Sequence, residues 1–365
     1  MTNETVGAMT QRSIAALIAA PLVLALFLVT SLVRLPFGTY APGTTVDVLA
    51  QPEGNETIQV RGAKTYRDTG QLRMTTVSVS AAVPPGQTGG SSLFTLLRAW
   101  ADPEDAVYPY DFIHPDNESA EEDQQQGAIS MVTSQDVATA VALEKLGYDV
   151  ERAVKVYFVD EGTPAEGVLE PLDIIRSVGG EPVRTPRQLV AAVSGAEAGE
   201  PLAVVIERDG RRREVSITPE EVEGQPRIGV VPGEGYRFPF EVSVAIDPKI
   251  GGPSAGLVFS LGIYDTLTEG SLTGGEVIAG TGTVALDGSV GPIGGIQQKI
   301  AGAADDGATL FLVPPDNCEE ALGADVDGIR LLRADTFDST LAAIQDWVED
   351  PDAALPSCED VPDDA

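Results

Sequence analysis

The sequence predicts an α/β (α+β) chain of more than one domain, preceded by one N-terminal transmembrane helix. Its 365 residues are enough for two or three domains with a sizeable core. Residues 13–33 carry no charge, which is typical of a membrane-spanning helix. Between residues 241 and 313, β-branched strand patterns alternate with apolar helical patterns, which indicates one α/β unit.

The uncharged stretch Ser13–Val33 lies between Arg12 and Arg34. At about 1.5 Å per residue it spans roughly 30 Å, which matches the hydrocarbon thickness of a bilayer. A cleaved signal peptide has a shorter apolar region and an A-x-A site, and no such site occurs between Arg34 and Gly43. The sequence therefore favours a retained anchor, while one arginine on each side leaves its orientation open.

Acidic residues dominate the composition and give a formal net charge of −33. This balance argues against nucleic acid or an anionic membrane surface as a partner, and it indicates a strongly solvated surface. Neither the G-x-x-x-x-G-K-[ST] sequence nor any Gly-Lys dipeptide occurs, so the sequence contains no P-loop ATPase. We expect no cofactor and no bound metal.

The two cysteines, Cys318 and Cys358, have neither metal-ligand spacing nor a C-x-x-C motif. They are either two buried thiols or one disulfide that holds the acidic tail at 349–365. The tail itself is proline-containing and charged, so we expect it to be loose.

A serine lies where a predicted strand turns into a predicted helix. Alternating β-branched residues indicate a strand from Glu241 to Ile246, and two glycines then allow a sharp turn. Pro253 suits the first position of a helix, which makes Gly252 its cap and places Ser254 in its first turn. The free N–H groups of a first turn lie at the positive end of the helix dipole. This loop therefore offers Ser254 donors for a developing oxyanion.

A second motif, 291–303, places a lysine on the packed face of a short helix. Lys299 follows Ile296 by three residues and precedes Ala303 by four. An isolated lysine in such a place usually lays its stem along the core. Polar Gln297 and Gln298 already occupy the outer side, which favours burial of the amine. A desolvated amine has a lowered pKa and can take a proton from a serine.

Two other interpretations of the same stretch are excluded. The G-x-S-x-G nucleophile elbow requires a histidine after the serine, but His114 is the single histidine and lies upstream. Residues 280–285 match a dinucleotide fingerprint, which requires a following helix. The sequence around Asp287-Gly288 instead predicts a hairpin turn.

Gly-Pro-Ser-Ala-Gly followed by Pro-Ile-Gly-Gly-Ile-x-x-Lys resembles the proteolytic domain of the Lon-type serine–lysine peptidases. The resemblance implies that Ser254 is the nucleophile, Lys299 the general base, and Thr281 the residue that hydrogen-bonds the lysine amine. The additional Ile250-Gly251 is similar to the membrane-anchored bacterial branch that pairs this domain with a PDZ module. In that branch the long C-terminal part lies outside the cytoplasm. The oligomeric state stays open.

The segment from Val154 to Pro219 resembles a PDZ module, through residues 156–167 and 172–180. The resemblance implies peptide binding. Its carboxylate-binding loop is either Leu146-Gly147-Tyr148 or lies elsewhere, because Gly147 is equally suited to be only a helix C-cap.

We expect the PDZ module to be inserted in the peptidase domain, because 224–240 is too short to supply the strand and helix that precede the serine strand in a Lon-type domain. The strand 72–79 and the helix 131–147 are the upstream candidates for these elements. The expected parts are a tail (1–12), an anchor (13–33), the N-terminal part of the peptidase domain (40–147) with an acidic mobile loop (101–126), a PDZ domain (149–223), a catalytic domain (224–348) and an acidic tail (349–365).

The sequence thus predicts a membrane-anchored, ATP-independent serine endopeptidase that cleaves exported or membrane proteins captured by its PDZ domain. The alternative is a catalytically inactive PDZ scaffold that binds protein C-termini at the membrane. Ser254, Lys299 and Thr281 are all present, which favours the enzyme because a scaffold does not require them.

Overall fold

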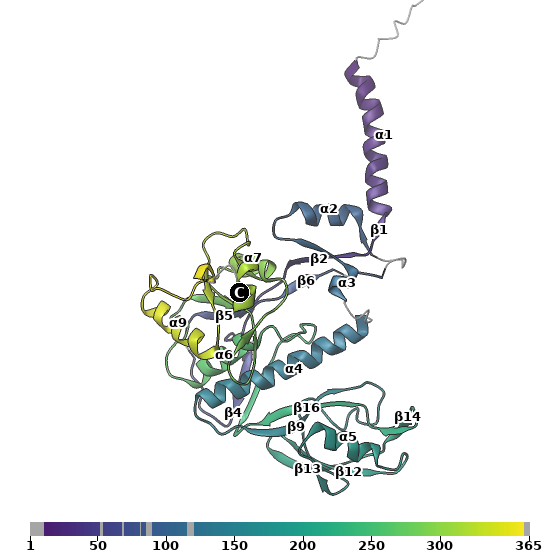
Figure 1. Cartoon of the computed structure of the whole chain (residues 1–365), viewed down its shortest axis with the longest axis vertical. Helices are drawn as coiled ribbons and strands as arrows, with labels where there is room; N and C mark the ends of the chain where they lie inside the picture. The colour runs from purple at the N-terminus through teal and green to yellow at the C-terminus, as the bar shows by residue number, and fades with distance from the viewer. Residues whose placement is uncertain are drawn as a thin grey trace, which may run out of the picture. The chain divides into compact units, whose positions relative to one another are not determined.

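The computed structural model describes residues 11–51, 54–67, 69–80, 82–84, 90–114 and 120–360. The chain divides into two compact units (Figure 1). One comprises residues 1–42 and 77–118, and the other comprises residues 43–76 and 119–365. The expected N-terminal part of the peptidase domain, 40–147, is therefore divided between the two units.

The first unit contains the apolar N-terminal helix. Helix α1 (Gln11–Leu32) includes an 18-residue window, Ala15–Leu32, with a mean hydropathy of 2.5. By length and composition this helix is able to cross a membrane, and a signal sequence would pass the same test. The other elements of the unit are β1 (Arg34–Leu35), β2 (Phe37–Pro42), β6 (Val77–Val79), β7 (Ser91–Ser92), α2 (Leu93–Ala101), β8 (Ala106–Pro109) and α3 (Tyr110–Ile113).

These elements correct two expectations. The acidic segment 101–126 is not one loop, because it contains β8, α3 and the start of a long helix. The expected strand 72–79 is two strands: β6 pairs with β2 in the first unit, while β5 (Gln71–Met74) lies in the second. The break falls at Thr75 and Thr76, whose side chains bond to backbone oxygens of other segments.

The second unit is built around a five-stranded sheet with the order β22-β21-β18-β5-β3. Neighbouring strands are parallel, except that β3 is antiparallel to β5. Strands from both sides of the PDZ segment therefore form one sheet. Besides β5, the strands of this sheet are β3 (Val46–Asp47), β18 (Val277–Gly280), β21 (Leu310–Val313) and β22 (Arg330–Arg333). Strands β4 (Ile58–Arg61) and β17 (Glu241–Val244) form a separate antiparallel pair.

Helix α6 (Gly256–Leu267) is the centre of this core, and most of its residues are buried. Leu257, Phe259 and Leu261 are fully buried, and each such side chain contributes about 1.5–3 kcal/mol relative to exposure. A Cβ on Gly262 would lie 2.7 Å from the Ile58 side chain, so glycine permits the close packing there. The second unit also contains helices α7 (Ile296–Asp305) and α9 (Phe337–Glu349), and a hairpin of β19 (Thr283–Val284) and β20 (Val290–Gly291).

Helix α4 runs from Ala120 to Lys145 and is longer than expected, since the apolar pattern alone indicates a start at Met131. Its first turns are rich in alanine, glutamate and glutamine, which favour helix without an apolar stripe. It lies beside α6 and also beside the PDZ strands (Figure 1).

The PDZ segment forms a sheet of its own with the order β13-β12-β10-β9-β16. Its last strand, β16 (Val230–Arg237), pairs with β9 (Glu151–Val159). The module therefore extends beyond the expected end at residue 223, and 224–237 does not belong to the catalytic domain. The remaining elements are β10 (Ile174–Val178), β11 (Glu181–Pro182), α5 (Pro186–Ser194), β12 (Leu202–Arg208), β13 (Arg211–Ile217), β14 (Glu220–Val222) and β15 (Gln225–Arg227).

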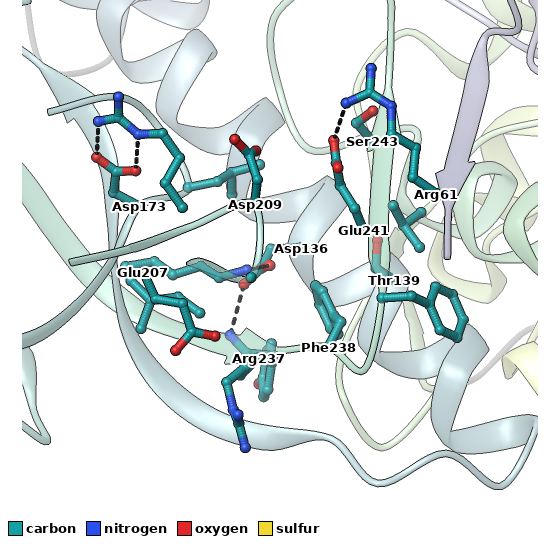
Figure 2. A pocket seen from close by; sticks show the side chains of 18 of the residues that line it. Arg61, Asp136, Thr139, Asp173, Glu207, Asp209, Arg237, Phe238, Glu241 and Ser243 are labelled. Atoms are coloured by element: carbon teal, nitrogen blue, oxygen red, sulfur yellow. Dashed lines mark hydrogen bonds and ion pairs between the residues drawn. The ribbon is translucent and has the colours of Figure 1, made fainter. Parts of the chain in front are cut away.

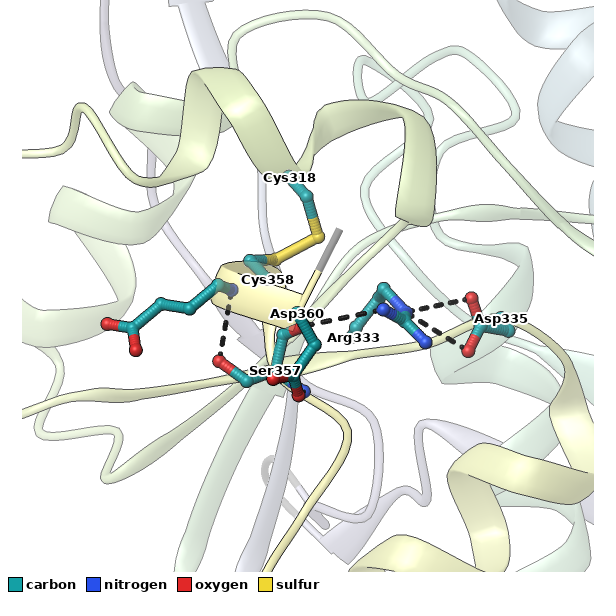
Figure 3. The surroundings of a disulfide bond; sticks show 7 residues. Cys318, Arg333, Asp335, Ser357, Cys358 and Asp360 are labelled. Carbon is teal, nitrogen blue, oxygen red and sulfur yellow. Dashed lines mark hydrogen bonds and ion pairs between the residues drawn. A yellow bond between two sulfur atoms is a disulfide. The ribbon is translucent and has the colours of Figure 1, made fainter. Parts of the chain in front are cut away.

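The described part of the acidic tail is fixed rather than loose. Cys318 and Cys358 form a disulfide, and both are buried (Figure 3). Arg330 donates to the carbonyl oxygens of Pro351 and Ala353 at 2.7 and 2.6 Å. The expectation of a loose tail is therefore wrong for residues 350–360, and residues 361–365 lie outside the described part.

Candidate active site

The serine loop enters the helix later than the sequence predicts. Helix α6 begins at Gly256 with Ala255 as its N-cap, so Pro253 is not its first residue and Gly252 is not its cap. Ser254 lies in the turn that Gly256 N–H closes on the Pro253 oxygen at 3.3 Å. Ser254 is half-buried and remains next to the positive end of the helix.

Ser254 is held through its backbone carbonyl. That oxygen accepts from Gly282 N–H at 2.7 Å and from the Thr281 hydroxyl at 3.0 Å. Both donors follow directly after β18. The central strand of the sheet therefore fixes the position of the serine.

Lys299 lies inside the protein on α7, and 3% of it is exposed. Its Nζ donates to the Thr281 hydroxyl at 3.0 Å. Desolvation by burial lowers the pKa of Lys299 to about 8. Among the described residues no carboxylate forms an ion pair with it, and the Thr281 hydroxyl is the acceptor that its amine retains. A substantial fraction of the amine is then neutral in mildly alkaline solution.

Thr281 connects the two candidate residues. Its hydroxyl accepts a hydrogen bond from Lys299 and donates one to the Ser254 carbonyl. Thr281 is fully buried, so water does not compete for either bond. The structure thus brings Ser254, Thr281 and Lys299 together from the starts of α6 and α7 and the end of β18.

The backbone amides of the loop are used differently from the expectation. Gly252 N–H donates to the Gly127 oxygen of α4 at 2.9 Å, so it does not point a free hydrogen at a substrate. In the part of the chain that the structure describes, the Ser254 and Ala255 N–H groups have no hydrogen-bond acceptor. These two amides are therefore available to donate to a bound group.

Two residues of α4 that the sequence motifs do not reveal support the loop. Besides Gly127, Ser134 donates from Oγ to the Pro253 oxygen at 3.0 Å. A Cβ on Gly256 would lie 2.9 Å from this Oγ and 3.0 Å from Val284 N, which explains why the motif ends in glycine. No local pattern predicts these contacts, because α4 is more than a hundred residues away in the sequence.

A hollow of about 300 Å³ lies beside the serine loop. Helix α4, the loop and strand β19 form its walls, and its lining is mixed apolar and hydroxylic. The lining residues are Gln126, Ile129, Ser130, Thr133, Ser134, Val137, Pro253, Thr283 and Val284.

The lysine helix is also supported from its other side. The Asn317 side chain accepts from Ile293 N–H and donates to the Ile293 oxygen, both at 2.9 Å. Cys318 follows Asn317 and carries the disulfide to Cys358 (Figure 3). The disulfide therefore links the C-terminal segment to Cys318, whose neighbour Asn317 holds the loop before the lysine helix.

Leu146-Gly147-Tyr148 ends helix α4. Gly147 has a φ of +81°, its N–H donates to Glu144, and Tyr148 N–H donates to Leu143. This pattern is a Schellman motif, so the backbone of these residues caps a helix. The Tyr148 ring packs edge-on against Phe240, which follows shortly after the end of β16.

Comparisons with known proteins agree with these two parts of the chain. Residues 129–218 match the PDZ domain model, and residues 243–330 match the Lon protease (S16) C-terminal proteolytic domain. The chain therefore combines a PDZ domain with a Lon-type proteolytic domain. The proteolytic model covers only the half of the core that follows the module.

The chain matches only part of the length of each of the following relatives. Lon protease 2 of Bacillus subtilis is 35% identical over 95 residues, which is 26% of this chain and 17% of that protein. Zinc metalloprotease RasP of Geobacillus kaustophilus is 34% identical over 151 residues, 40% of this chain and 32% of that protein. The PDZ domain of the SdrC-like protein of Listeria innocua is 23% identical with a TM-score of 0.21, covering 22% of this chain and 92% of that domain.

Proposed function

We propose that this protein is a membrane-anchored, ATP-independent serine endopeptidase with Ser254 as nucleophile and Lys299 as general base. The observation that carries the proposal is the buried Lys299 amine, which has a pKa of about 8 and donates to the Thr281 hydroxyl. The same hydroxyl donates to the backbone carbonyl oxygen of Ser254. A lysine activates a serine only when a useful fraction of it is neutral. Burial without an ionic partner supplies that condition.

In the proposed reaction, Ser254 Oγ gives its proton to Lys299 Nζ and attacks the scissile carbonyl carbon. The developing oxyanion accepts hydrogen bonds from the free amides of Ser254 and Ala255, each contributing on the order of 3 kcal/mol. The lysine then gives the proton to the leaving amine, and the C–N bond breaks. Water deprotonated by the same lysine hydrolyses the acyl-enzyme.

The hollow beside Pro253 is the proposed site for a substrate side chain. It lies against the serine loop and is lined in part by Ile129, Val137 and Val284. A pocket of this kind favours a small or aliphatic side chain over a charged one.

We place peptide capture at the edge of the PDZ sheet. Strand β16 pairs with β9 on one side and is terminal in the sheet, and helix α5 packs beside it. An extended chain end adds as a further strand to such an edge through backbone hydrogen bonds. Exported or membrane proteins are the proposed substrates, since α1 is suited to the membrane and a disulfide persists in an oxidising compartment.

The test is proteolysis by the full chain in detergent micelles without nucleotide. We expect the wild type to cleave an unstructured protein substrate, and Ser254→Ala to leave it intact. Peptide binding without cleavage by the wild type would favour the inactive scaffold instead.

A further inference from the structure

One face of helix α4 holds the serine loop. Gly127 accepts from Gly252 N–H at 2.9 Å, and Ser134 donates to the Pro253 oxygen at 3.0 Å. The two contacts bracket the residues directly before Ser254. They therefore hold the backbone of the two residues that precede the nucleophile.

Another face of the same helix holds the PDZ module. Asp136 accepts from Lys155 Nζ and from Tyr236 N–H at 3.1 Å. The Tyr157 hydroxyl lies 3.2 Å from Asp136 and 2.6 Å from the Glu234 oxygen of β16, so the two acceptors share its proton. Asp136 and Lys155 are 3% and 4% exposed, so this is a buried ion pair. Strand β9 contributes Lys155 and Tyr157, and β16 contributes Tyr236. Asp136 therefore joins α4 to two neighbouring strands of the module.

The module and the catalytic core are otherwise separated at this point by a cavity of about 480 Å³. Figure 2 shows Asp136 in this pocket, with Asp173 and Glu207 of the module on one side and Arg61 and Glu241 of the core on the other. Among the described residues, the Asp136 cluster is the buried connection between α4 and the module at this pocket, and Gln125 of α4 also donates to Asp160 of the module at 2.8 Å.

Ser134 and Asp136 are two residues apart, so they lie roughly 3 Å apart along the axis of a continuous helix and on different faces. We propose that Ser134 is a positioning residue for Ser254, and that the PDZ module sets its placement through the Asp136 cluster and α4. The inference rests on the proposed function, since it assigns a regulation to the same serine. A chain end bound at β16 would then change the reactivity of Ser254 without touching it.

The experiment uses two substitutions in the full chain. Ser134→Ala removes the hydroxyl at the loop end, with Thr139→Val as its control because Thr139 bonds within α4 to the Gln135 oxygen. Tyr157→Phe removes the hydroxyl that contacts both Asp136 of α4 and the Glu234 oxygen of β16. Its control is Arg176→Gln, because Arg176 pairs with Glu207 inside the module.

The first readout is the rate at which a fluorophosphonate acylates Ser254, followed against pH. We expect Ser134→Ala to slow acylation about tenfold, which is the effect of losing one hydrogen bond directly beside the serine loop. Tyr157→Phe should slow it about threefold, because the hydrogen bond that it removes lies farther from Ser254. The pH midpoint should stay unchanged, because Lys299 is not touched. In the Ser134→Ala background Tyr157→Phe should have a smaller effect than in the wild type, since only the Gly127–Gly252 bond still joins α4 to the loop.

The second readout is amide hydrogen exchange of residues 247–256, which does not depend on catalysis. We expect faster exchange in Tyr157→Phe and no change in Arg176→Gln. Failure of the wild type to react at Ser254 would overturn the proposed function, and exchange would still decide this inference. Unchanged exchange in Tyr157→Phe, or an equal threefold effect in both backgrounds, would overturn the inference itself.

Discussion

Lys299 and Thr281 are joined by a 3.0 Å hydrogen bond inside the protein, from Nζ to Oγ1. The bond orients the amine, and the same hydroxyl donates a hydrogen bond to the Ser254 carbonyl oxygen. A lysine that was only filling the core would not need a buried hydroxyl shared with the serine loop. The relationship leads to the first prediction.

Thr281→Val keeps the shape of the side chain and removes the hydroxyl. We expect maximal activity to fall about tenfold, because the amine and the loop lose their common partner. The midpoint of the pH profile should fall below about 8, since the ammonium form loses its acceptor. Initial rates against pH measure both, and Thr281→Ser should behave as the wild type. An unchanged midpoint and plateau in Thr281→Val would show that the bond has no catalytic role.

Lys299→Met should stabilise the fold while abolishing activity. The pKa of Lys299 falls from 10.5 to about 8 on folding, so the unfolded chain binds its proton more tightly. The resulting penalty is complete below pH 8, amounts to about 3 kcal/mol, and disappears as the pH rises towards 10.5. Urea unfolding should show a higher free energy of unfolding for Lys299→Met than for the wild type at pH 7, and a smaller difference between the two at pH 9.5. Exposed Lys249→Met is the control, and an equal gain in it would refute the explanation.

Replacing both Cys318 and Cys358 by alanine should destabilise the protein by about 2–4 kcal/mol, since the bridge closes a loop over a separation of 40 residues. Thermal unfolding measures the loss. In protein from its native envelope the thiols should react with alkylating reagents only after reduction. Immediate alkylation would show that the bridge is absent there.

Gly256→Ala should reduce activity more than tenfold, because its Cβ would meet Ser134 Oγ at 2.9 Å and Val284 N at 3.0 Å. Helix α4 or the serine loop must then move. Gly294→Ala is the matched control, since nothing lies within 4 Å of its added Cβ. Specific activity and a crystal structure of the variant test the prediction together. Equal, small effects of both substitutions would contradict the packing argument.

The sequence motifs and the resemblance that they carry point to Ser254, Lys299 and Thr281, and the structure brings these three residues together, while their catalytic roles stay predictions. The motifs were insufficient for Gly127 and Ser134, whose contacts with the loop depend on how distant helices pack. The end of the PDZ module was misplaced for the same reason. Strand β16 becomes part of the module only through its pairing with β9, some seventy residues earlier in the chain.

The expected oxyanion donor shows a different limit. The sequence predicts oxyanion donors in the glycine-rich loop and the first helical turn, but whether a particular amide is free depends on the acceptors around it. Here the Gly127 oxygen occupies Gly252 N–H. Backbone hydrogen bonds between remote segments leave no trace in residue patterns, because any residue supplies them.

The central claim is that Lys299 activates Ser254. The most direct measurement is mass spectrometry of the fluorophosphonate adduct on the full chain, with the rate of its formation followed from pH 6 to pH 10. We predict one adduct on Ser254, a rate that rises through a midpoint near pH 8, and a loss of about a thousandfold or more in Lys299→Ala. An adduct on another residue, or formation at a similar rate in Lys299→Ala, would contradict the account.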